Sequence, residues 1–425
     1  MKIVLLNTFE SKGGAAIACK RLMRALQKQG VDVKLVVRDK TSGDTNVISV
    51  NSSFFKRNLN FARFAWERFI IYCNNKFNKE NLFTVSLANT GIDVSKLQVV
   101  NGADIIHIHW TNQGFLSLSD IKKLIDTGKP IVLTMHDMWS FTGICHYSAE
   151  CDNYSNACEN CFLLGSKKTT DLSTKIFRRK QIEIYSKPVN LIGCSKWISD
   201  KAKLSRLTQN SRVLSIPNPI DTDVFRKNDK IQARENLNLP LGKKLILFGA
   251  LNIGDKRKGA DYLIKAIKNL REQYQADYEN VNIVVFGQAK GGLDEYFGLT
   301  IHYMGYLNGN EQIVDLYNAV DIYATPSMED NLPNMIMESM ACGTPCIGFN
   351  TGGIPEMIDH ELNGYVAEYK SVDDLARGIH RLIFAADYDK LSENARQKVV
   401  DFYSEEIIAK KYIDLYNDLL NNEGV

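Results

Sequence analysis

Two acidic side chains, Asp330 and Glu338, stand eight positions apart in "SMEDNLPNMIMESMACGTP", residues 327–345. Pro333 suits the first turn of a helix, and Gly343, followed by Thr-Pro, suits its end. Glu338 would then lie in mid-helix among small and apolar neighbours, where a carboxylate is costly unless it is paired or hydrogen-bonded. The two hydroxyls of a vicinal diol could both donate to it. The alternative is a structural ion pair with a buried lysine or arginine.

Asp330 stands just before the predicted helix, where free backbone N–H groups favour anions. We expect this carboxylate and the following backbone to form one wall of a ligand site, with Glu338 as a second point farther in. The expected binding positions on that wall are Asp330, Asn331, Leu332, Pro333 and Asn334.

A basic pair stands in "LFGALNIGDKRKGADYLI", residues 247–264, which follows a predicted strand and opens a helix. Arg257 and Lys258 would lie on the loop, and Gly259 would allow close backbone approach. Two cations beside a helix N-terminus suit a diphosphate. Preorganised cations would lower the barrier as a diphosphate departs, by ~3 kcal/mol for one donor in comparable sites. A solvated basic surface is the alternative interpretation.

Gly13 and Gly14 lie between a predicted strand and helix in "FESKGGAAIACKRL", residues 9–22. They would let the loop approach a phosphate or another bound group. The pattern is not G-x-G-x-x-G, so it gives little support to a nicotinamide site. An ordinary β–α turn containing glycines is the alternative.

Histidines and tryptophans follow two other predicted strands. "TMHDMW" carries His136 and Trp139, and Trp139 could stack on a sugar ring. "HIHW" places His107 and His109 on one face of a strand end. The alternatives are hydrogen-bonded structural histidines and a core tryptophan.

Four cysteines lie close together in "CHYSAECDNYSNACENC" with the spacing C-x5-C-x6-C-x2-C. In a reducing compartment such a cluster favours a structural zinc ion that pins the loop, because four thiolates leave no open position for catalysis. Free thiols, or disulfides formed after purification, are the alternatives. The expected ligands are Cys145, Cys151, Cys158 and Cys161.

Residues 54–79, "FFKRNLNFARFAWERFIIYCNNKFNK", mix aromatic side chains with lysine and arginine. Such a helix could lie on an anionic membrane surface. The alternative is an amphipathic helix packed on the N-terminal domain.

Short apolar runs alternate with helical-period segments along the whole chain, which predicts an α/β fold with two doubly wound parallel sheets. "IPNPIDTDVF", residues 216–225, is the expected linker. The predicted domains are residues 1–218 with a cysteine-rich insert at 145–161, residues 219–402, and a final helix at 403–425 that crosses back to the first domain. Ligands of open parallel sheets bind beyond the carboxyl ends of the strands, so we expect a cleft between the two domains.

The composition narrows the class of protein. The 425 residues carry a formal net charge of +3 and 44% hydrophobic residues. A balance this close to neutral gives no sign of a nucleic-acid partner. No apolar run reaches the ~18–20 residues that span a bilayer, and the N-terminus does not resemble a signal peptide. We therefore expect a cytoplasmic protein, at most one at the inner face of the membrane.

The chain resembles family 4 of the retaining glycosyltransferases, which have the GT-B fold. The resemblance rests on the pair Asp330 and Glu338, which is like the family's E-x7-E signature except that Asp330 stands where the family has Glu. The resemblance covers nearly the whole chain and is weakest between residues 40 and 95. Further matching segments are "DIYATPS", "ESMACGTPCIGFNTGGIPEMI", "NGYVAE", "IPNPIDTDVF" and "GADYLIKAI", while "EDNLPN" resembles a branch concerned with bacterial surface polysaccharide, such as capsule or exopolysaccharide.

The resemblance implies that Glu338 binds the nucleotide ribose, Asp330 the donor sugar and Lys258 the diphosphate. It also implies that the loop of Gly13 and Gly14 faces the donor diphosphate and that His136 faces the transferred sugar or the acceptor. We expect His109 and Trp139 on the acceptor side. We expect no catalytic metal or cofactor, since cationic side chains and helix ends can neutralise the leaving group. The expected activity is transfer of a sugar from a UDP- or GDP-sugar to a glycan or lipid-linked glycan, with retention of configuration. A sugar-nucleotide epimerase of the same fold, or a non-catalytic nucleotide-sugar-binding protein, is the alternative.

Overall fold

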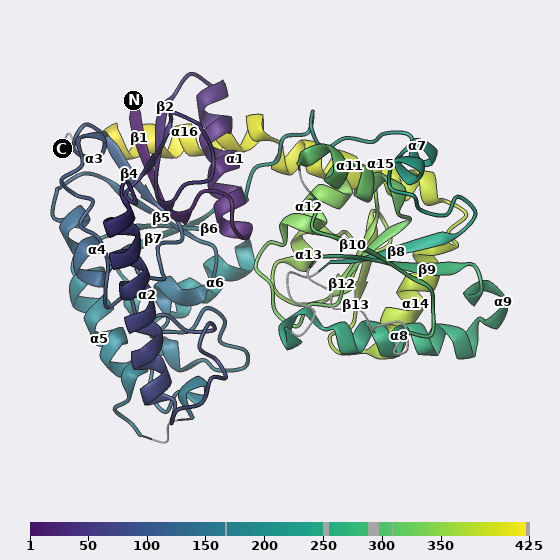
Figure 1. The fold of residues 1–425 in the computed structure, drawn as a ribbon, viewed down its shortest axis with the longest axis horizontal. Helices are drawn as coiled ribbons and strands as arrows, with labels where there is room; N and C mark the ends of the chain where they lie inside the picture. Colours follow the sequence, from purple (N-terminus) through teal and green to yellow (C-terminus); the bar gives the residue numbers. More distant parts are fainter. Residues whose placement is uncertain (166–167, 250–254, 288–296, 308, 422–425) are drawn as a thin grey trace. The chain divides into compact units, whose positions relative to one another are not determined.

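The computed structural model describes residues 1–165, 168–249, 255–287, 297–307 and 309–421, and these fall into two units (Figure 1). One unit holds Met1–Pro219 together with the chain from Ile408 onward, and the other holds Ile220–Ile407. The boundary after Pro219 lies inside the proline-containing segment that the sequence marks as a linker. Of the segments used above, residues 250–254 and 422–425 lie outside the described residues.

The N-terminal unit is built on a seven-stranded parallel sheet in the order β3-β2-β1-β4-β5-β6-β7. Its central strands are continuous apolar runs because helices cover both faces of the sheet. The strands are β1 (Lys2–Phe9), β2 (Asp32–Asp39), β3 (Val47–Ser49), β4 (Ile105–Ile108), β5 (Ile131–Met135), β6 (Asn190–Gly193) and β7 (Arg212–Ser215).

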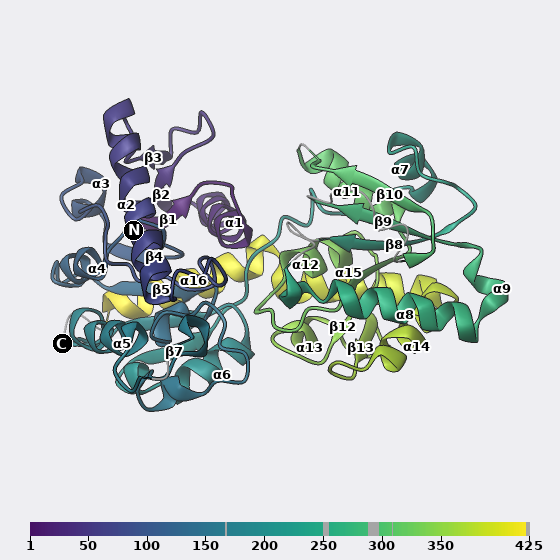
Figure 2. The ribbon, with the colours of Figure 1, turned by 60° about the horizontal axis from the view of Figure 1, so that its bottom comes forward.

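Besides α16 (Glu405–Asn421) at the carboxyl-terminal end, six α-helices connect or flank these strands in the described part of this unit (Figure 2). The longest is α2, which begins after Ser53, whose side chain accepts a hydrogen bond from the backbone of Lys56. The helices are α1 (Gly14–Lys28), α2 (Phe54–Asn74), α3 (Gln98–Asn101), α4 (Leu118–Ile125), α5 (Leu172–Glu183) and α6 (Lys196–Leu204).

The C-terminal unit repeats the plan with a six-stranded parallel sheet in the order β10-β9-β8-β11-β12-β13. The strands are β8 (Lys244–Gly249), β9 (Val281–Phe286), β10 (Ile301–Gly305), β11 (Ile322–Thr325), β12 (Cys346–Phe349) and β13 (Gly364–Ala367). The described helices are α7 (Lys230–Asn236), α8 (Ala260–Gln273), α9 (Gln275–Tyr278), α11 (Asn310–Ala319), α12 (Asn334–Ala341), α13 (Ile354–Met357), α14 (Val372–Ile383) and α15 (Tyr388–Tyr403). The last helix, α16 (Glu405–Asn421), begins in this unit, and from Ile408 onward it belongs to the N-terminal unit.

Each sheet has one place where the winding direction reverses. In the N-terminal unit β1 has β2 on one side and β4 on the other, and in the C-terminal unit β8 lies between β9 and β11. Loops that leave such a pair of strands diverge to opposite faces and open a crevice at the carboxyl edge. The predicted ligand-binding loops after β1, β8 and β11 all start at these two positions.

The last helix, α16, packs on the N-terminal sheet. Tyr412, Leu415 and Tyr416 are buried in the same apolar cluster as residues of β1, β2 and α1. The Tyr416 hydroxyl lies 2.7 Å from His107 Nδ1 on β4. The chain that leaves the N-terminal unit at Pro219 therefore supplies part of its core at the other end of the sequence.

The prediction of two doubly wound parallel sheets is confirmed. Three short strands, β3, β10 and β13, were not predicted as strands, and each lies at an edge of its sheet. Among the described helices none is both long and apolar enough to span a bilayer.

Candidate active site

The loop after β8 is shaped by a glycine that no other residue could replace without a shift in the backbone. Arg257 and Lys258 belong to a short 3-10 turn, and Gly259 follows it at φ +70° before α8 begins. A Cβ atom on Gly259 would lie 1.9 Å from the carbonyl oxygen of Pro326, just after β11. The backbone amide of Met328 also donates to the Arg257 carbonyl, at 2.7 Å. The loops after β8 and β11 are thus held against each other.

This contact brings the predicted cations onto the predicted acid. Lys258 Nζ lies 2.6 Å and Arg257 Nη1 lies 3.6 Å from Oδ2 of Asp330, and all three side chains are partly or largely buried. Burial acts to raise the pKa of Asp330, but Lys258 and then Arg257 outweigh it and hold the pKa below its ordinary value. The site therefore carries two cations and one carboxylate at neutral pH.

A third loop, after β12, closes on the same carboxylate. Gly352 has φ +60°, and a Cβ there would lie 1.8 Å from the backbone oxygen of Asp330. The amide of Gly353 donates to that oxygen at 3.0 Å, and the Thr351 hydroxyl donates to the Met328 carbonyl at 3.1 Å. Strands β8, β11 and β12 are neighbours in the sheet, so three successive carboxyl ends fix the position of Asp330.

Glu338 lies in the middle of α12, as the sequence predicts. Pro333 caps the helix, which ends before Gly343 at φ +76°. The carboxylate is buried and accepts a 2.7 Å hydrogen bond from the Tyr317 hydroxyl on α11. Burial, and then the charge of Glu338, raise the pKa of Tyr317 well above its ordinary value, so this hydroxyl stays protonated and donates. Tyr317 was missed from the sequence because a tyrosine at an apolar helical position looks like core.

The residues between the two acids are mostly enclosed. Asn331, Leu332 and Pro333 are buried, and Asn334 is half-buried. The backbone hydrogen bond of Asn331 is one of the contacts that lower the pKa of Asp330. This stretch therefore supports the carboxylate from within the C-terminal unit.

In the N-terminal unit, the glycine pair lies at the start of α1. Gly13 is the residue before the helix at φ +90°, and no heavy atom lies within 4 Å of a Cβ built on it. Gly14 is exposed and opens the helix. Gly13 is therefore needed for its backbone conformation, and the space beside it is open.

Glu10, which was not predicted, anchors the loop that carries Gly13. Its buried carboxylate lies 2.5 Å from Lys20 Nζ and accepts hydrogen bonds from the amides of Thr41 and Ser42 at 2.7 and 2.9 Å. Burial acts to raise the pKa of Glu10, but Lys20, Ser42 and Thr41 together outweigh it and lower the pKa to about 2. The loop after β1 is thereby tied to the loop after β2.

The low pKa of Glu10 predicts a pH-dependent contribution to stability. Relative to its ordinary value of 4.5, a pKa of about 2 corresponds to about 3 kcal/mol. Because the folded state has the lower pKa, this stabilisation is present above pH 4.5 and is lost as the pH falls toward 2. Glu10→Gln should lower the free energy of unfolding by about 3 kcal/mol at pH 7, and by roughly half of that or less at pH 3. Urea unfolding at both pH values measures it.

Glu80→Gln, at an exposed glutamate, is the matched control and should change the free energy of unfolding little at either pH. If Glu10→Gln follows the pH dependence of the wild type, the assignment of Glu10 is wrong.

Buried His109 and half-buried His136 form a chain of contacts at the ends of β4 and β5. His109 Nδ1 lies 2.9 Å from His136 Nε2, and His136 Nδ1 lies 3.6 Å from Cys194 Sγ. Burial is the largest cause that lowers the pKa of each, to about 4 for His136 and well below its ordinary value for His109. Both rings are therefore neutral at pH 7. Because both nitrogens of His136 have these partners, a hydrogen bond to a sugar would require exchanging one of them.

His107 is a structural histidine. Its Nδ1 lies 2.7 Å from the Tyr416 hydroxyl and its Nε2 lies 2.7 Å from Thr134 Oγ1. Burial, and then the charge of His136, lower the pKa of His107 to about 3. The alternative interpretation of a satisfied core histidine therefore describes His107.

A small cavity of about 20 Å³ lies beside this chain, which is room for about one water molecule. Its lining includes His109, Asn112 and Ser140. Within the described residues, His109 Nε2, Asn112 Oδ1 and Ser140 Oγ are buried without a hydrogen-bond partner. The end of β4 therefore has a small, mostly apolar pocket that contains a few polar atoms without a partner among the described residues.

Asp137, which directly follows His136, connects several of these groups. Its carboxylate accepts a 2.8 Å hydrogen bond from Trp110 Nε1 and lies 2.7 Å from His146 Nδ1. Burial acts to raise the pKa of Asp137, but His146 is the chief contact that outweighs it and lowers the pKa. The Trp110 ring in turn stacks on Phe9 at the end of β1, with ring centres 6.2 Å apart. The strand ends after β1, β4 and β5 thus form one polar and aromatic surface.

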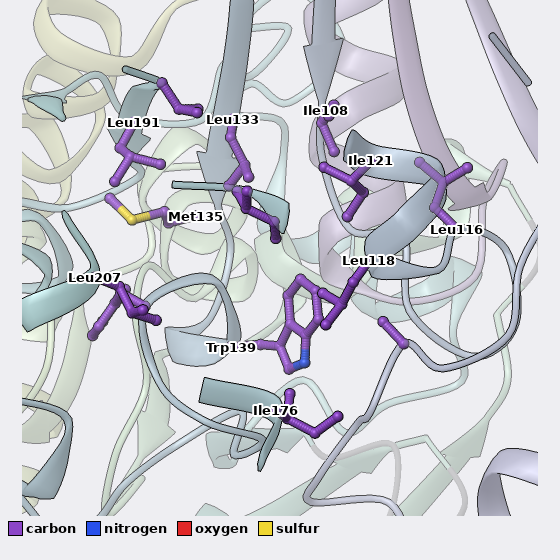
Figure 3. Close-up of a cluster of buried hydrophobic side chains, with 14 of the residues drawn as sticks. Ile108, Leu116, Leu118, Ile121, Leu133, Met135, Trp139, Ile176, Leu191 and Leu207 are labelled. Atoms are coloured by element: carbon purple, nitrogen blue, oxygen red, sulfur yellow. The ribbon is translucent and has the colours of Figure 1, made fainter. Parts of the chain in front are cut away.

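Trp139 lies in the apolar core. Figure 3 shows its ring among the side chains of Leu118 and Ile176, and it is 5% exposed. Its Nε1 donates to the Ser86 carbonyl at 2.9 Å, and Lys180 Nζ lies 3.7 Å from the ring centre. The expected stacking of a sugar on Trp139 would need a ring face that this packing covers, so Trp139 is better described by the core alternative.

The four predicted zinc ligands are all free cysteines in the structure. Burial is the largest cause that raises the pKa of three of these thiols, to about 12 for Cys158, to about 11 for Cys161 and upward for Cys145. Gly143 donates its amide to Cys158 Sγ at 3.1 Å. Within the described ranges, no three His, Cys, Asp or Glu side chains are arranged to hold a metal ion. A structural zinc at Cys145, Cys151, Cys158 and Cys161 stays a prediction from the spacing.

Each of the two units matches a family model of known proteins. A family model described as "Glycosyltransferase Family 4" matches residues 12–224, half of the chain, and one described as "Glycosyl transferases group 1" matches residues 229–398. An uncharacterized glycosyltransferase of Methanocaldococcus jannaschii is 26% identical over 370 residues, which is 80% of this chain and 91% of that protein.

Solved structures share the fold over nearly the full length. Sucrose-phosphate synthase of Thermosynechococcus elongatus superposes with a TM-score of 0.66 at 18% identity, covering 99% of this chain and all of that one. Anabaena HepE, solved in complex with UDP-glucose, gives a TM-score of 0.63 at 14% identity, covering 98% of this chain and all of that one. The chain has the GT-B fold and belongs to glycosyltransferase family 4.

Proposed function

We propose that this glycosyltransferase moves a sugar, with retention of configuration, from a nucleoside-diphosphate donor to a glycan or lipid-linked glycan acceptor. A role in bacterial surface polysaccharide biosynthesis would follow. The observation that carries the donor class is the cluster of Lys258, Arg257 and Asp330 at the switch point of the C-terminal sheet, with Glu338 on the next helix. A UDP- or GDP-sugar supplies both a diphosphate and a pentose diol to such a site.

Each group of the cluster has a role that its contacts support. Lys258 and Arg257 would neutralise the diphosphate, and Asp330 orients both cations before the donor arrives. Asp330 would then meet the donor sugar together with the backbone of Asn331–Asn334. Glu338 is buried and already accepts a hydrogen bond from the Tyr317 hydroxyl, and it would accept further hydrogen bonds from the hydroxyls of a ribose.

All atoms and protons that move in the transfer step come from the donor and the acceptor. The acceptor oxygen attacks the anomeric carbon on the face from which the diphosphate leaves, as the bond from that carbon to the phosphate oxygen breaks. The acceptor proton passes to an oxygen of the leaving diphosphate. Charge builds up on the diphosphate in this step, and preorganised cations at Lys258 and Arg257 would stabilise it.

The polar surface at the ends of β1, β4 and β5 supports a role of His109 and His136 toward the transferred sugar or the acceptor, and of Gly13 and Gly14 toward the donor diphosphate. The neutral His136 is better suited to positioning than to proton transfer at pH 7. The open space beside Gly13 is where the loop after β1 could approach a phosphate or an acceptor.

A thermal-shift panel of UDP-, GDP- and ADP-sugars, followed by radiolabelled transfer assays with the stabilising donor, tests this proposal. One donor class should raise the apparent Tm with the logarithm of its concentration. The labelled sugar should then appear in a larger product only when acceptor glycan is present. A new sugar isomer formed without acceptor would instead identify an epimerase, and binding without turnover under any acceptor would identify a sensor.

A further inference from the structure

Helix α2 has its polar residues on the buried side and its large apolar residues on the exposed side, the reverse of a helix that covers an apolar core. Its buried residues are mostly polar, namely Asn60, Glu67 and Arg68 with Ile71. Its outer face carries large apolar side chains, in a helix that lies on the outside of the N-terminal unit (Figure 1, Figure 2). An amphipathic helix packed on a domain would show the opposite arrangement.

The polar stripe of α2 is firmly attached. Glu67 is fully buried and accepts hydrogen bonds from the amides of Leu87 and Ala88 at 2.6 and 3.0 Å. Arg68 pairs with Glu67 at 2.9 Å and donates to the Val85 carbonyl at 3.0 Å. These bonds fix the rotation of the helix about its axis, so its outward face is set by the fold.

The outward face is aromatic. Its five large rings are 53–81% exposed, and two of them, Trp66 and Phe69, stack on each other with ring centres 5.8 Å apart. Exposed apolar side chains that occur singly need no explanation, but a row of this kind on one helix marks an interaction surface. We call it the α2 aromatic face, and it consists of Phe54, Phe55, Phe61, Trp66 and Phe69.

Charge decides what covers this face. The segment 54–79 holds six lysines and arginines and a single acid, Glu67, which is buried on the other side of the helix. Lys56 and Arg57 are exposed beside the aromatic rings. A second copy of the same face would bring like charges together, which is unfavourable. An anionic lipid surface would accept the rings among its acyl chains and the cations among its head groups.

We propose that the α2 aromatic face docks the protein onto an anionic membrane surface, with α2 lying in the plane of the interface. Its 21 residues would extend about 30 Å along that surface. Rings of phenylalanine and tryptophan enter the boundary between head groups and chains, while Lys56 and Arg57 stay with the head groups. This binding needs neither donor nor turnover, so it can fail or hold independently of the proposed function.

Sedimentation of the full-length protein with phosphatidylcholine vesicles, with and without phosphatidylglycerol, tests the proposal. The wild type should partition onto the anionic vesicles, and added salt should weaken the binding. Lys56→Gln with Arg57→Gln should weaken partitioning by about 30-fold, since each cation near the surface contributes about 1 kcal/mol. Phe55→Ser with Phe69→Ser should weaken it at least as much, because two large rings leave the interface.

Helix α5 supplies matched controls on the same unit. Lys175→Gln with Arg178→Gln removes two exposed cations there, and Ile182→Ser removes a side chain that is 66% exposed. Neither should change partitioning. Equal binding to neutral and anionic vesicles, equal loss in the α5 variants, or a dimer in sedimentation equilibrium that Phe55→Ser with Phe69→Ser dissociates would each overturn the proposal.

Discussion

Lys258→Ala is expected to lower kcat/KM for sugar transfer by about 10²–10³-fold, the usual effect of removing one preorganised donor to a developing anion. Lys258 lies 2.6 Å from Asp330, in a loop fixed by the contact of Gly259 with Pro326. Its ammonium is therefore in place before the diphosphate arrives. Steady-state kinetics with the donor found in the thermal-shift panel measures the loss, which should fall mainly on kcat.

The neighbouring Lys256 is the matched control. It is an exposed cation on the same 3-10 turn, two residues before Lys258. Lys256→Ala should leave kcat/KM within a few-fold of the wild type, because exposed charges contribute little. Full activity in a folded Lys258→Ala variant would remove Lys258 from the mechanism.

A loss of fold must be separated from a loss of chemistry. Lys258→Ala leaves the buried Asp330 carboxylate with Arg257 at 3.6 Å, and an unbalanced buried charge destabilises a protein by several kcal/mol. Adding Asp330→Asn removes that charge. The double variant should recover the Tm of the wild type while transfer stays at the low level of Lys258→Ala. Recovery of transfer together with Tm would show that the pair is only structural.

Glu338→Gln is expected to weaken binding of the nucleoside diphosphate by at least about 100-fold, because two hydrogen bonds to a charged acceptor contribute roughly 1.5–3 kcal/mol each. The test is a thermodynamic cycle in which titration calorimetry measures four affinities. The wild type and the variant each bind the ribonucleotide and its 2′,3′-dideoxy analogue. The wild type should lose affinity when the hydroxyls are removed, and Glu338→Gln should bind both ligands about equally.

Tyr317→Phe is the matched control for Glu338. It removes the 2.7 Å hydrogen bond to the same carboxylate without touching the ligand-facing acceptor. This variant should lose stability but still distinguish the two nucleotides. If Glu338→Gln also keeps that discrimination, Glu338 does not read the ribose and acts only as the partner of Tyr317.

The sequence predicted the interior of both sheets better than their margins. Strands such as β1 and β5 are continuous apolar runs because both of their faces are covered. The missed strands, β3, β10 and β13, lie at sheet edges. In β3 and β10 partly exposed side chains break the apolar run, and β13 is only four residues long and begins with a glycine. Their positions depend on the order in which the strands pair in the folded sheet, and a local sequence pattern carries no information about that order.

The site shows the same division. Lys258 and Asp330 could each be assigned from local context, as a cation after a strand and an acid before a helix. Their pairing across 72 residues needs the adjacency of β8 and β11, which only the folded sheet provides. The partner of Glu338 was missed for a related reason, since Tyr317 has an ordinary place in the apolar face of α11.

The route of the final helix has a consequence for how the molecule can be divided. Tyr412 and Tyr416 complete the apolar core on one face of the sheet at β1 and β4. A fragment that stops at Pro219 would therefore expose this apolar face and remove the hydroxyl that contacts His107. A stop codon or a bulky fusion near the carboxyl terminus would therefore damage the half of the protein farthest from it in sequence.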